Sequence, residues 1–154
     1  MSEDAERAEH LLRGIRKAMR DSVWAEGGDL QVSLTAPQVQ ALSVLVDDLR
    51  AGGSGLSLSE LSTRMGLAHS TVSGIVTRLE QRGLLHRAEH PGDRRYLRIQ
   101  LAAPVREWVA RDLPAARLRP LDAAFEQATE EERAAVLTGL TTLGRLLGLD
   151  GPGG

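Results

Sequence analysis

The chain has 154 residues, of which 42% are hydrophobic and 26% are charged, as expected for a folded globular protein and not for a disordered one. It contains no cysteine, which excludes disulfide bonds, cysteine-ligated zinc and a thiol-based sensor. Its net charge of −2 conceals a basic segment, because residues 69–98 hold six arginines against three acidic residues. Such a segment predicts a local anion-binding surface. No apolar run approaches the ~20 residues of a membrane span and no signal-peptide core is present, so we expect a cytoplasmic protein.

The first segment has apolar residues alternately three and four positions apart, the pattern of a helix that packs on a partner helix. These residues are Ala5, Ala8, Leu12, Ile15 and Met19. The pattern ends at Gly27 and Gly28. A second helix is predicted to begin at a capping box formed by Thr35 and Gln38. Its apolar face consists of Val39, Leu42, Val46 and Leu49. The glycine-rich run 51–55 then predicts a flexible connection.

A second capping box, of Ser57 and Glu60, opens a short helix that buries Leu58, Leu61 and Met65. Gly66 supplies a sharp turn, because glycine adopts positive φ without steric cost. A fourth helix follows and ends at Gly83. Its core face consists of Val72, Ile75, Val76 and Leu79. Two short helices joined by a few residues around a glycine predict a helix-turn-helix.

Residues 84–89 and 96–101 are predicted as two strands joined by a turn at His90-Pro91-Gly92-Asp93-Arg94. In the second strand an apolar set alternates with a second set, so the two sets are predicted to face opposite ways. The apolar set is Leu97, Ile99 and Leu101; the other is Tyr96, Arg98 and Gln100. A hairpin directly after a helix-turn-helix is a wing.

Residues 104–128 are predicted as a long helical stretch, which Pro114 and Pro120 should kink or interrupt. A third capping box, of Thr129 with Glu132, opens the last helix. Its apolar residues again lie three and four positions apart: Val136, Leu140, Leu143 and Leu147. Residues 150–154 are predicted to form a disordered tail.

The outward face of the fourth helix carries short polar side chains and an arginine, the composition of a helix that enters the major groove of DNA. The candidate contacts are Ser70, Thr71, Ser73, Gly74, Thr77 and Arg78. Hydroxyl groups hydrogen-bond base edges or phosphates, and a glycine allows close approach. Ser57 and Ser59 are expected near the DNA backbone, together with the N–H groups that begin their helix. The alternative is a solvated helix face, which the adjacent basic hairpin makes the weaker interpretation.

Arg94 and Arg95 lie at the tip of the predicted wing, where an arginine reaches the minor groove or the flanking phosphates. The neighbouring Asp93 is expected to orient Arg95 or Arg87, which makes Asp93 and Arg87 the orienting residues of the wing. The alternative is a solvated turn with an ordinary surface ion pair, which contributes little.

Met19, Trp24 and Trp108 are candidates for a ligand pocket between the terminal helices and the winged part, although such residues at helical spacing are more often core. His86 and His90 have the spacing of an inverted zinc-protease motif, but that motif requires a helix and this segment is predicted as a strand. We expect no metal, no cofactor and no enzymatic activity, because the chain has no set of nucleophile, base and metal ligands.

The chain resembles the MarR family (multiple antibiotic resistance regulators). The matching residues are the Gly66 turn, Ser70-Thr71-Val72-Ser73, the run 79–87, Asp93-Arg94-Arg95, Ile99-Gln100-Leu101, and Leu34-Thr35 with Gln38. The resemblance covers roughly residues 34–101 and rests on helix order outside them. It implies an obligate homodimer, with a winged helix in each subunit and a dimerisation domain made from the first and last helices. It also implies a repressor that small, often phenolic, ligands release from operator DNA.

Three features depart from the family pattern. Ala68 and His69 stand where Ser-Pro is often found, which weakens the N-cap of the recognition helix. Gly74 stands where many members have a larger, often basic, residue, so base specificity does not transfer from relatives. Tyr96 is bulkier than the residue that usually follows Asp-Arg-Arg.

The sequence therefore predicts an all-α fold with a small two-stranded β wing. A winged helix-turn-helix domain is expected at residues 35–101 and a helical dimerisation domain at residues 1–34 and 102–154. The expected function is that of a homodimeric transcriptional regulator that binds a pseudo-palindromic operator and responds to a small aromatic or apolar effector, without membrane association. The alternative is a winged-helix module that binds a protein and no DNA, for which the clustered arginines of the wing would be unnecessary.

Overall fold

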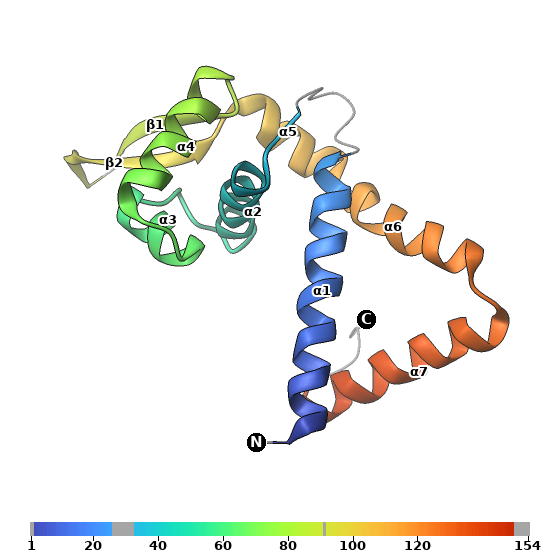
Figure 1. Ribbon diagram of the computed structural model, residues 1–154. Helices are drawn as coiled ribbons and strands as arrows, with labels where there is room; N and C mark the ends of the chain where they lie inside the picture. Colours follow the sequence, from blue (N-terminus) through green and yellow to red (C-terminus); the bar gives the residue numbers. More distant parts are fainter. Residues whose placement is uncertain (1, 26–32, 91, 150–154) are drawn as a thin grey trace. The chain divides into compact units, whose positions relative to one another are not determined.

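The computed structural model describes residues 2–25, 33–90 and 92–149. Its elements are α1 (Glu3–Ala25), α2 (Ala36–Arg50), α3 (Leu58–Met65), α4 (His69–Gln81), β1 (Leu85–His90), β2 (Asp93–Leu101), α5 (Ala103–Arg111), α6 (Leu113–Gln127) and α7 (Glu130–Leu146) (Figure 1). The chain divides into two compact units, residues 1–117 and 118–154, with the boundary inside α6. The predicted mostly helical fold with one two-stranded sheet is confirmed.

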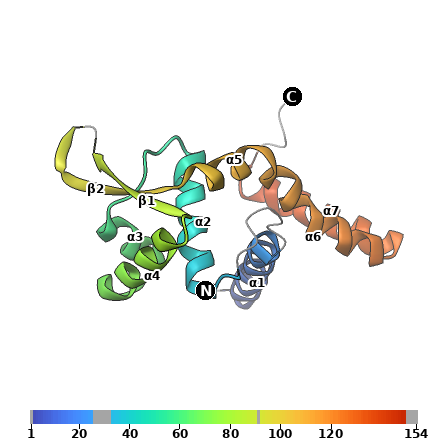
Figure 2. The ribbon, with the colours of Figure 1, turned by 90° about the horizontal axis from the view of Figure 1, so that it is seen from above.

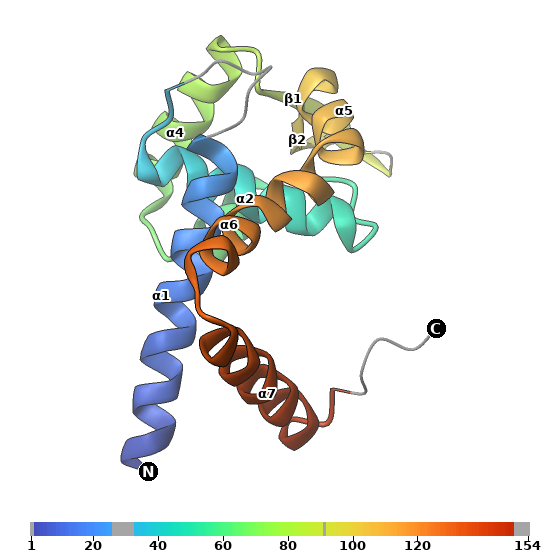
Figure 3. The ribbon, with the colours of Figure 1, turned by 90° about the vertical axis from the view of Figure 1, so that its right-hand side faces the viewer.

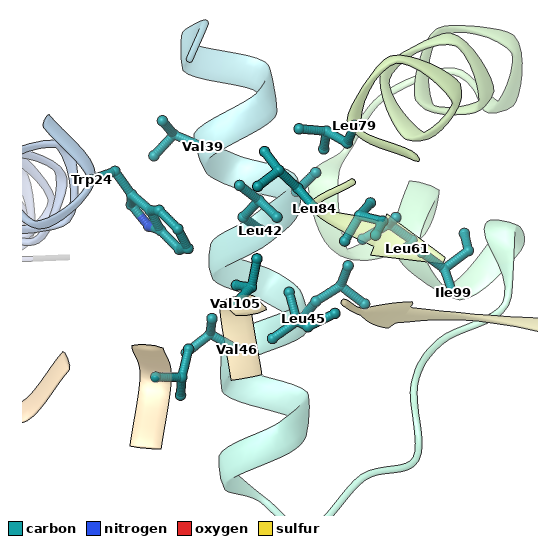
Figure 4. Close-up of a cluster of buried hydrophobic side chains, with 14 of the residues drawn as sticks. Trp24, Val39, Leu42, Leu45, Val46, Leu61, Leu79, Leu84, Ile99 and Val105 are labelled. Atoms are coloured by element: carbon teal, nitrogen blue, oxygen red, sulfur yellow. The ribbon is translucent and has the colours of Figure 1, made fainter. Parts of the chain in front are cut away.

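The core of the first unit is built around α2, which lies between side chains from α1, the helix-turn-helix, the hairpin and α5 (Figure 4). The most deeply buried large side chains are Leu42, Leu56, Leu61, Leu79, Leu85, Val72, Val76 and Val105. Each such leucine or valine stabilises the fold by about 1.5–3 kcal/mol. Leu49, predicted to share the buried face of α2, is 36% exposed, because it lies in the last turn of the helix.

The helix-turn-helix forms as predicted. The Ser57–Glu60 capping box begins α3, and Gly66 ends it in the left-handed region with φ of +67°. The predicted core face of α4 is buried throughout. Gly83, which follows the C-cap of α4, has a φ of +71°. Leu58 was predicted to be buried with Leu61, but it is only partly buried, as it occupies the first turn of α3.

The hairpin is longer than predicted, because β2 begins at Asp93, three residues before Tyr96. The strands pair antiparallel from Leu85 opposite Leu101 to Glu89 opposite Leu97; the next pair joins His90 to Asp93, so residues 94–96 have no partner in β1. Within the first unit, the hairpin extends away from α2 (Figure 2). Within the apolar set of β2, Ile99 and Leu101 are buried, whereas Leu97 is 51% exposed, because it lies on the extended part of the hairpin.

The glycine-rich run 51–55 forms a loop whose backbone is hydrogen-bonded to the end of α2. The carboxylate of buried Asp48 accepts a hydrogen bond from the N–H of Gly55 at 3.0 Å, and the Asp48 carbonyl accepts one from Gly53 at 2.8 Å. Leu56 then pairs with Ile99 of β2 through two backbone hydrogen bonds of 3.1 and 2.7 Å. The loop therefore fastens the start of α3 to the wing.

The predicted interruption of the 104–128 stretch occurs at Asp112, between α5 and α6, and Pro114 lies in the first turn of α6. Pro120 is inside α6 and does not end it. Thr129 and Glu132 form the predicted capping box of α7. The sequence features at Gly27, Gly28, Pro91 and the tail 150–154 lie outside the described residues.

The predicted seams of α1 and α7 are only partly exposed. On α1, Ala5 and Ile15 are exposed, as is Leu11 outside the predicted seam, whereas Ala8, Leu12 and Met19 are half-buried. Of the predicted seam of the last helix only Leu143 is half-buried, and α7 has no buried residue among those described. The exposed set on and just after α7 is Val136, Leu137, Leu140, Leu146, Leu147 and Leu149. Both segments are continuous helices (Figure 3). Apolar helix faces of this length are typical of surfaces that pack on another helix.

Candidate nucleic-acid interface

The predicted recognition face of α4 is open to solvent. Ser70, Thr71, Thr77 and Arg78 are exposed, and Ser73 and Gly74 are half-buried. The N-cap residue Ala68 makes no side-chain hydrogen bond, in line with the weak cap predicted for this position. The N–H groups of the first turn thus have no side-chain acceptor from the cap, and the positive end of the helix dipole favours an anion there.

Thr77 is less available than the other hydroxyl residues of this face. Its Oγ1 donates its proton to the carbonyl oxygen of Ser73 at 3.0 Å, within α4. The same oxygen accepts a long hydrogen bond of 3.5 Å from Nη2 of Arg87 on β1. The hydroxyl of Thr77 is therefore engaged inside the domain, unlike those of Ser70 and Thr71.

Gly74 is not required by the fold. It has no positive φ, and a Cβ added there would meet no atom within 4 Å. A glycine inside a helix costs about 1 kcal/mol relative to alanine. The open position beside Ser73 leaves the backbone of α4 accessible on the face that carries the polar side chains.

At the wing, Asp93 pairs with Arg95. The carboxylate of Asp93 accepts hydrogen bonds from the backbone N–H of Arg95 at 3.0 Å, from its Nε at 3.1 Å and from its Nη2 at 3.0 Å. The side-chain bonds, and after them the backbone bond, lower the pKa of Asp93, and the side-chain bonds raise the pKa of Arg95. The Arg95 side chain nevertheless stays 87% exposed. Arg94 is 90% exposed and lies 3.6 Å from a carboxylate oxygen of Glu89.

Arg87 does not take part in this arrangement, although the sequence made it an alternative partner of Asp93. It forms an ion pair with Glu80 on α4. Arg98, which the sequence placed in the basic cluster of the wing, donates from Nη1 to the carbonyl of Gly55 at 2.7 Å and to Glu60 at 3.2 Å. Arg82 reaches the amide oxygen of Gln38 at 3.4 Å. Three of the six arginines in the basic segment thus bind other residues of the first unit.

The polar groups of Ser57 at the beginning of α3 are hydrogen-bonded within the helix. Ser57 donates its N–H to the carboxylate of Glu60 at 2.7 Å, and the Ser57 hydroxyl accepts from the Glu60 N–H at 3.1 Å. The Ser57 N–H is the main reason that the pKa of Glu60 is lowered. A carboxylate at this helix end repels a phosphate, so Ser57 and the first N–H groups of α3 are poorly placed for the backbone contact predicted for them. Ser59 is exposed.

Two of the three candidate ligand residues line a common pocket and the third does not. Met19 and Trp24 line a pocket of about 470 Å³ within the first unit, whereas Trp108 lies outside its lining and contacts Trp24, with ring centroids 5.1 Å apart. The remaining lining residues are Arg16, Arg20, Val23, Ser43, Val46, Asp47, Leu113 and Arg117. Trp24 donates its indole N–H to the hydroxyl of Ser43 at 3.0 Å.

The charge of this pocket comes mainly from arginines that sequence reasoning did not single out. Three arginines and one aspartate line it. The Nε atom of Arg20 is buried without a hydrogen-bond partner among the described residues, and its nearest carboxylate oxygen, Oδ1 of Asp21, is 3.7 Å away. Arg117 approaches Asp47 only to 3.9 Å. The unsatisfied Nε of Arg20 and the distant pairing of Arg117 favour an anionic group in the pocket.

His86 and His90 both lie in β1, an extended strand, so they lack the helical geometry of the zinc-protease motif. Across residues 2–25, 33–90 and 92–149 there is no group of three side chains suited to hold a metal ion. Within the same residues, no helix is both long and apolar enough to cross a membrane.

Comparison with known proteins gives consistent matches. The family model of the MarR family matches residues 32–95. YsmB of Bacillus subtilis, an uncharacterized HTH-type transcriptional regulator, is 33% identical over 104 residues, which is 68% of this chain and 67% of YsmB. The structure of a MarR family protein from Bacillus stearothermophilus is 27% identical, with a TM-score of 0.59, over 96% of this chain and 98% of that one.

MepR, a transcription regulator of a Staphylococcus aureus multidrug efflux pump, shares the fold. Its structure bound to ethidium bromide is 22% identical, with a TM-score of 0.57, over 90% of this chain and 95% of that one. A mutant of MepR has been solved bound to an oligodeoxyribonucleotide.

Proposed function

Because the chain belongs to the MarR family of DNA-binding transcriptional regulators, we propose that it is a homodimeric repressor of a pseudo-palindromic operator, released by a small ligand. The observation that carries this proposal is the pairing of an open polar face on α4 with Arg95 held outward by Asp93. One surface then offers both a helix for the major groove and a cationic tip for the minor groove or the flanking phosphates.

In this proposal α4 reads bases through Ser70, Thr71 and Ser73, and the exposed Arg78 lies farther along the same helix. Gly74 lets the helix backbone approach the groove floor closely. Arg94 and Arg95 carry the sequence-independent attraction of the wing, because both guanidinium groups are almost fully exposed. Thr77 and Ser57 serve mainly the internal geometry of the domain, since their hydroxyl groups are engaged within it.

The exposed apolar faces of α1 and α7 support the homodimer. Leu140 is 52% exposed, and no residue of α7 that the structure describes is buried. In a single subunit these apolar side chains stay in water, whereas packing on a second subunit would bury them and stabilise the protein. In a dimer with two-fold symmetry the two recognition helices enter successive major grooves about 34–36 Å apart, which requires a pseudo-palindromic operator.

The effector proposed here is a small molecule with an apolar body and an anionic group. Met19, Val23 and Trp24 supply an apolar wall to the pocket. The unsatisfied Nε of Arg20 and the loosely paired Arg117 supply donors for a carboxylate or a similar group. A cation such as ethidium, found in MepR, would meet three arginines and one aspartate here, so it should bind poorly.

Selection from random double-stranded DNA with the purified 154-residue chain tests the DNA-binding proposal. We expect enrichment of an inverted repeat with half-sites one helical turn apart. A variant with Ser70, Thr71 and Ser73 all replaced by alanine should lose this enrichment but still bind DNA weakly at low salt. If the natural chain enriches no sequence and binds no DNA at low salt, the protein-interaction alternative replaces the proposal.

The effector proposal is tested by a matched pair of ligands, 1-naphthoate and 1-naphthylmethylamine, titrated against the intrinsic fluorescence of the tryptophans. The anion should quench and the cation should not. Arg20→Gln should weaken binding of the anion, while Arg13→Gln on the same helix should not, because Arg13 is paired with Glu9 and does not line the pocket. Equal binding of both ligands would contradict an anion-selective pocket.

A further inference from the structure

Two arginines of the hairpin connect the wing to the helix-turn-helix. On β2, Nη1 of Arg98 donates to the carbonyl oxygen of Gly55 at 2.7 Å and to Oε2 of Glu60 at 3.2 Å. The Arg98 side chain is only 24% exposed, in contrast to Arg94 and Arg95 at the wing tip. Its guanidinium is therefore directed toward the start of α3 and is largely withdrawn from solvent.

Glu60 is itself held in place by the first turn of α3. Its carboxylate oxygen Oε2 accepts the N–H of Ser57 at 2.7 Å, and this same oxygen is the partner of Arg98. The capping box of α3 thus serves two purposes: it begins the helix and it presents a fixed carboxylate to the wing. Gln100 adds a second connection on the same strand, since its amide donates to the carbonyl of Ser54 at 2.7 Å.

On the other strand, Arg87 makes the equivalent connection to α4. Its guanidinium forms an ion pair with Glu80 near the end of the recognition helix and a long hydrogen bond of 3.5 Å to Thr77. Both partners in the ion pair are about one third exposed, so the pair is partly shielded from solvent. One strand is consequently fastened to α3 and the other to α4.

We propose that Arg98 and Arg87 are positioning residues of the DNA-binding surface, which fix the wing relative to the recognition helix and contact no phosphate themselves. This inference rests on the proposed DNA-binding function. It assigns to Arg98 a task that its place in a basic segment would not predict, since an ordinary interpretation of that segment counts Arg98 as a phosphate contact. For Arg87 it keeps the orienting task that the sequence predicts, but with Glu80 in place of Asp93 as the partner.

The need for such positioning follows from the shape of β2. Residues 94–96 have no partner in β1, so strand pairing does not hold the backbone that carries Arg94 and Arg95. Arg98 is the side-chain connection that follows this unpaired stretch. A contact surface with two parts, a helix and a wing, reaches two places on DNA only if the distance between its parts is fixed to within about 0.5 Å.

The test uses the 154-residue chain and the variants Arg98→Met, Glu60→Gln and their combination. Methionine keeps the length of the side chain but removes its donors, and glutamine preserves the capping box because Gln serves as well as Glu at this position. Arg98→Lys is the conservative rescue, since an ammonium group still donates to both acceptors. Arg95→Ala provides the comparison for loss of a phosphate contact.

Three measurements distinguish positioning from phosphate contact. Arg98→Met should weaken operator binding about tenfold and binding to unrelated DNA less than threefold, with the salt slope unchanged. Arg98→Lys should restore most of the operator affinity.

Glu60→Gln should weaken operator binding about as much as Arg98→Met does, and the double variant should bind the operator no more weakly than Arg98→Met alone. Without DNA, amide hydrogen exchange in residues 94–99 should accelerate in Arg98→Met. Arg87→Met should behave in the same way for DNA binding, with Glu80→Gln as its partner variant.

A fall of roughly 2 in the salt slope of the Arg98→Met dimer would overturn the proposal, because each lost phosphate contact contributes about 0.9. Additive effects of Arg98→Met and Glu60→Gln would also overturn it. The hydrogen-exchange measurement does not depend on DNA. If the natural chain binds no DNA, exchange still decides whether Arg98 fixes the wing, and the failure then belongs to the proposed function alone.

Discussion

Asp93 binds Arg95 through three hydrogen bonds of 3.0–3.1 Å, one from the backbone and two from the guanidinium, while the Arg95 side chain remains 87% exposed. The aspartate therefore restrains the arginine without withdrawing it from solvent. A restrained side chain loses less conformational entropy when it binds a second partner, which is the advantage of pre-organisation. An acidic residue at the tip of the wing is compatible with the proposed DNA binding, because its carboxylate is paired with Arg95 and orients that cation.

The capping carboxylate of Glu60 predicts a pH dependence of stability. Its pKa lies below the ordinary value of 4.5, chiefly because the carboxylate accepts the N–H of Ser57. A group with a lowered folded-state pKa stabilises the fold above its unfolded-state pKa, and this stabilisation is lost as the pH falls through the folded-state value. Unfolding free energies measured from pH 6 to pH 3 should therefore fall more steeply below pH 4.5 in the natural chain than in Glu60→Gln. Equal pH profiles would contradict the assignment.

Two glycines with positive φ should respond differently to alanine. At Gly66 an added Cβ meets nothing within 4 Å, so the cost is that of a left-handed alanine, about 1–2 kcal/mol. At Gly55 the Cβ would lie 2.6 Å from the carbonyl oxygen of Ile99 as well, so Gly55→Ala should cost about 3 kcal/mol or more. Chemical denaturation measures both. A smaller loss of unfolding free energy for Gly55→Ala than for Gly66→Ala would contradict the close approach of Gly55 to the backbone of β2.

Gly74→Ala should separate stability from function. The position is helical and open, so alanine should raise the unfolding free energy by about 1 kcal/mol. The same methyl group would project from the proposed recognition face and weaken operator binding. Gly14→Ala in α1 is the matched control, because its Cβ also meets nothing within 4 Å, and it should stabilise without affecting DNA binding. If Gly74→Ala binds the operator as tightly as the natural chain, close approach of α4 at Gly74 is excluded.

The dimer is tested on α7. Replacing both Leu140 and Leu143 by aspartate should give dissociated or unfolded protein, because two charges would enter the apolar seam. Thr141→Asp with Thr142→Asp places the same charges beside the seam and should leave the dimer intact. Sedimentation equilibrium and circular dichroism distinguish the states. A folded monomeric Leu140→Asp/Leu143→Asp variant that still binds operator DNA with full affinity would contradict the dimer.

The elements that sequence reasoning predicted well are those determined locally. The capping boxes at Ser57 and Thr129 depend on residues three positions apart, and the turn at Gly66 depends on a single residue. The buried face of α4 follows from helical periodicity. Such features are predictable because their causes lie within one turn of the chain.

The features that were missed depend on distant residues. Arg98 and Gly55 are separated by 43 positions in the sequence, and no local pattern predicts that an arginine of the wing binds the carbonyl of a glycine in this loop. The exposure of Leu97 depends on where the hairpin leaves the core, which alternation alone does not reveal. The engagement of Ser57 by Glu60 was visible as a capping box, but its consequence for phosphate binding required the position of the carboxylate.

The most direct test of the account compares the two parts of the proposed surface by binding isotherms over a salt series, on the selected operator and on unrelated DNA. Arg95→Ala should reduce affinity similarly on both DNAs and lower the salt slope of the dimer by roughly 2, since each contact contributes about 0.9. Thr71→Ala and Ser73→Ala should leave the slope nearly unchanged and weaken operator binding alone, by ~1–3 kcal/mol for a side chain that reads a base. An unchanged slope for Arg95→Ala, together with equal losses on both DNAs for Thr71→Ala and Ser73→Ala, would contradict the division of DNA recognition between wing and helix.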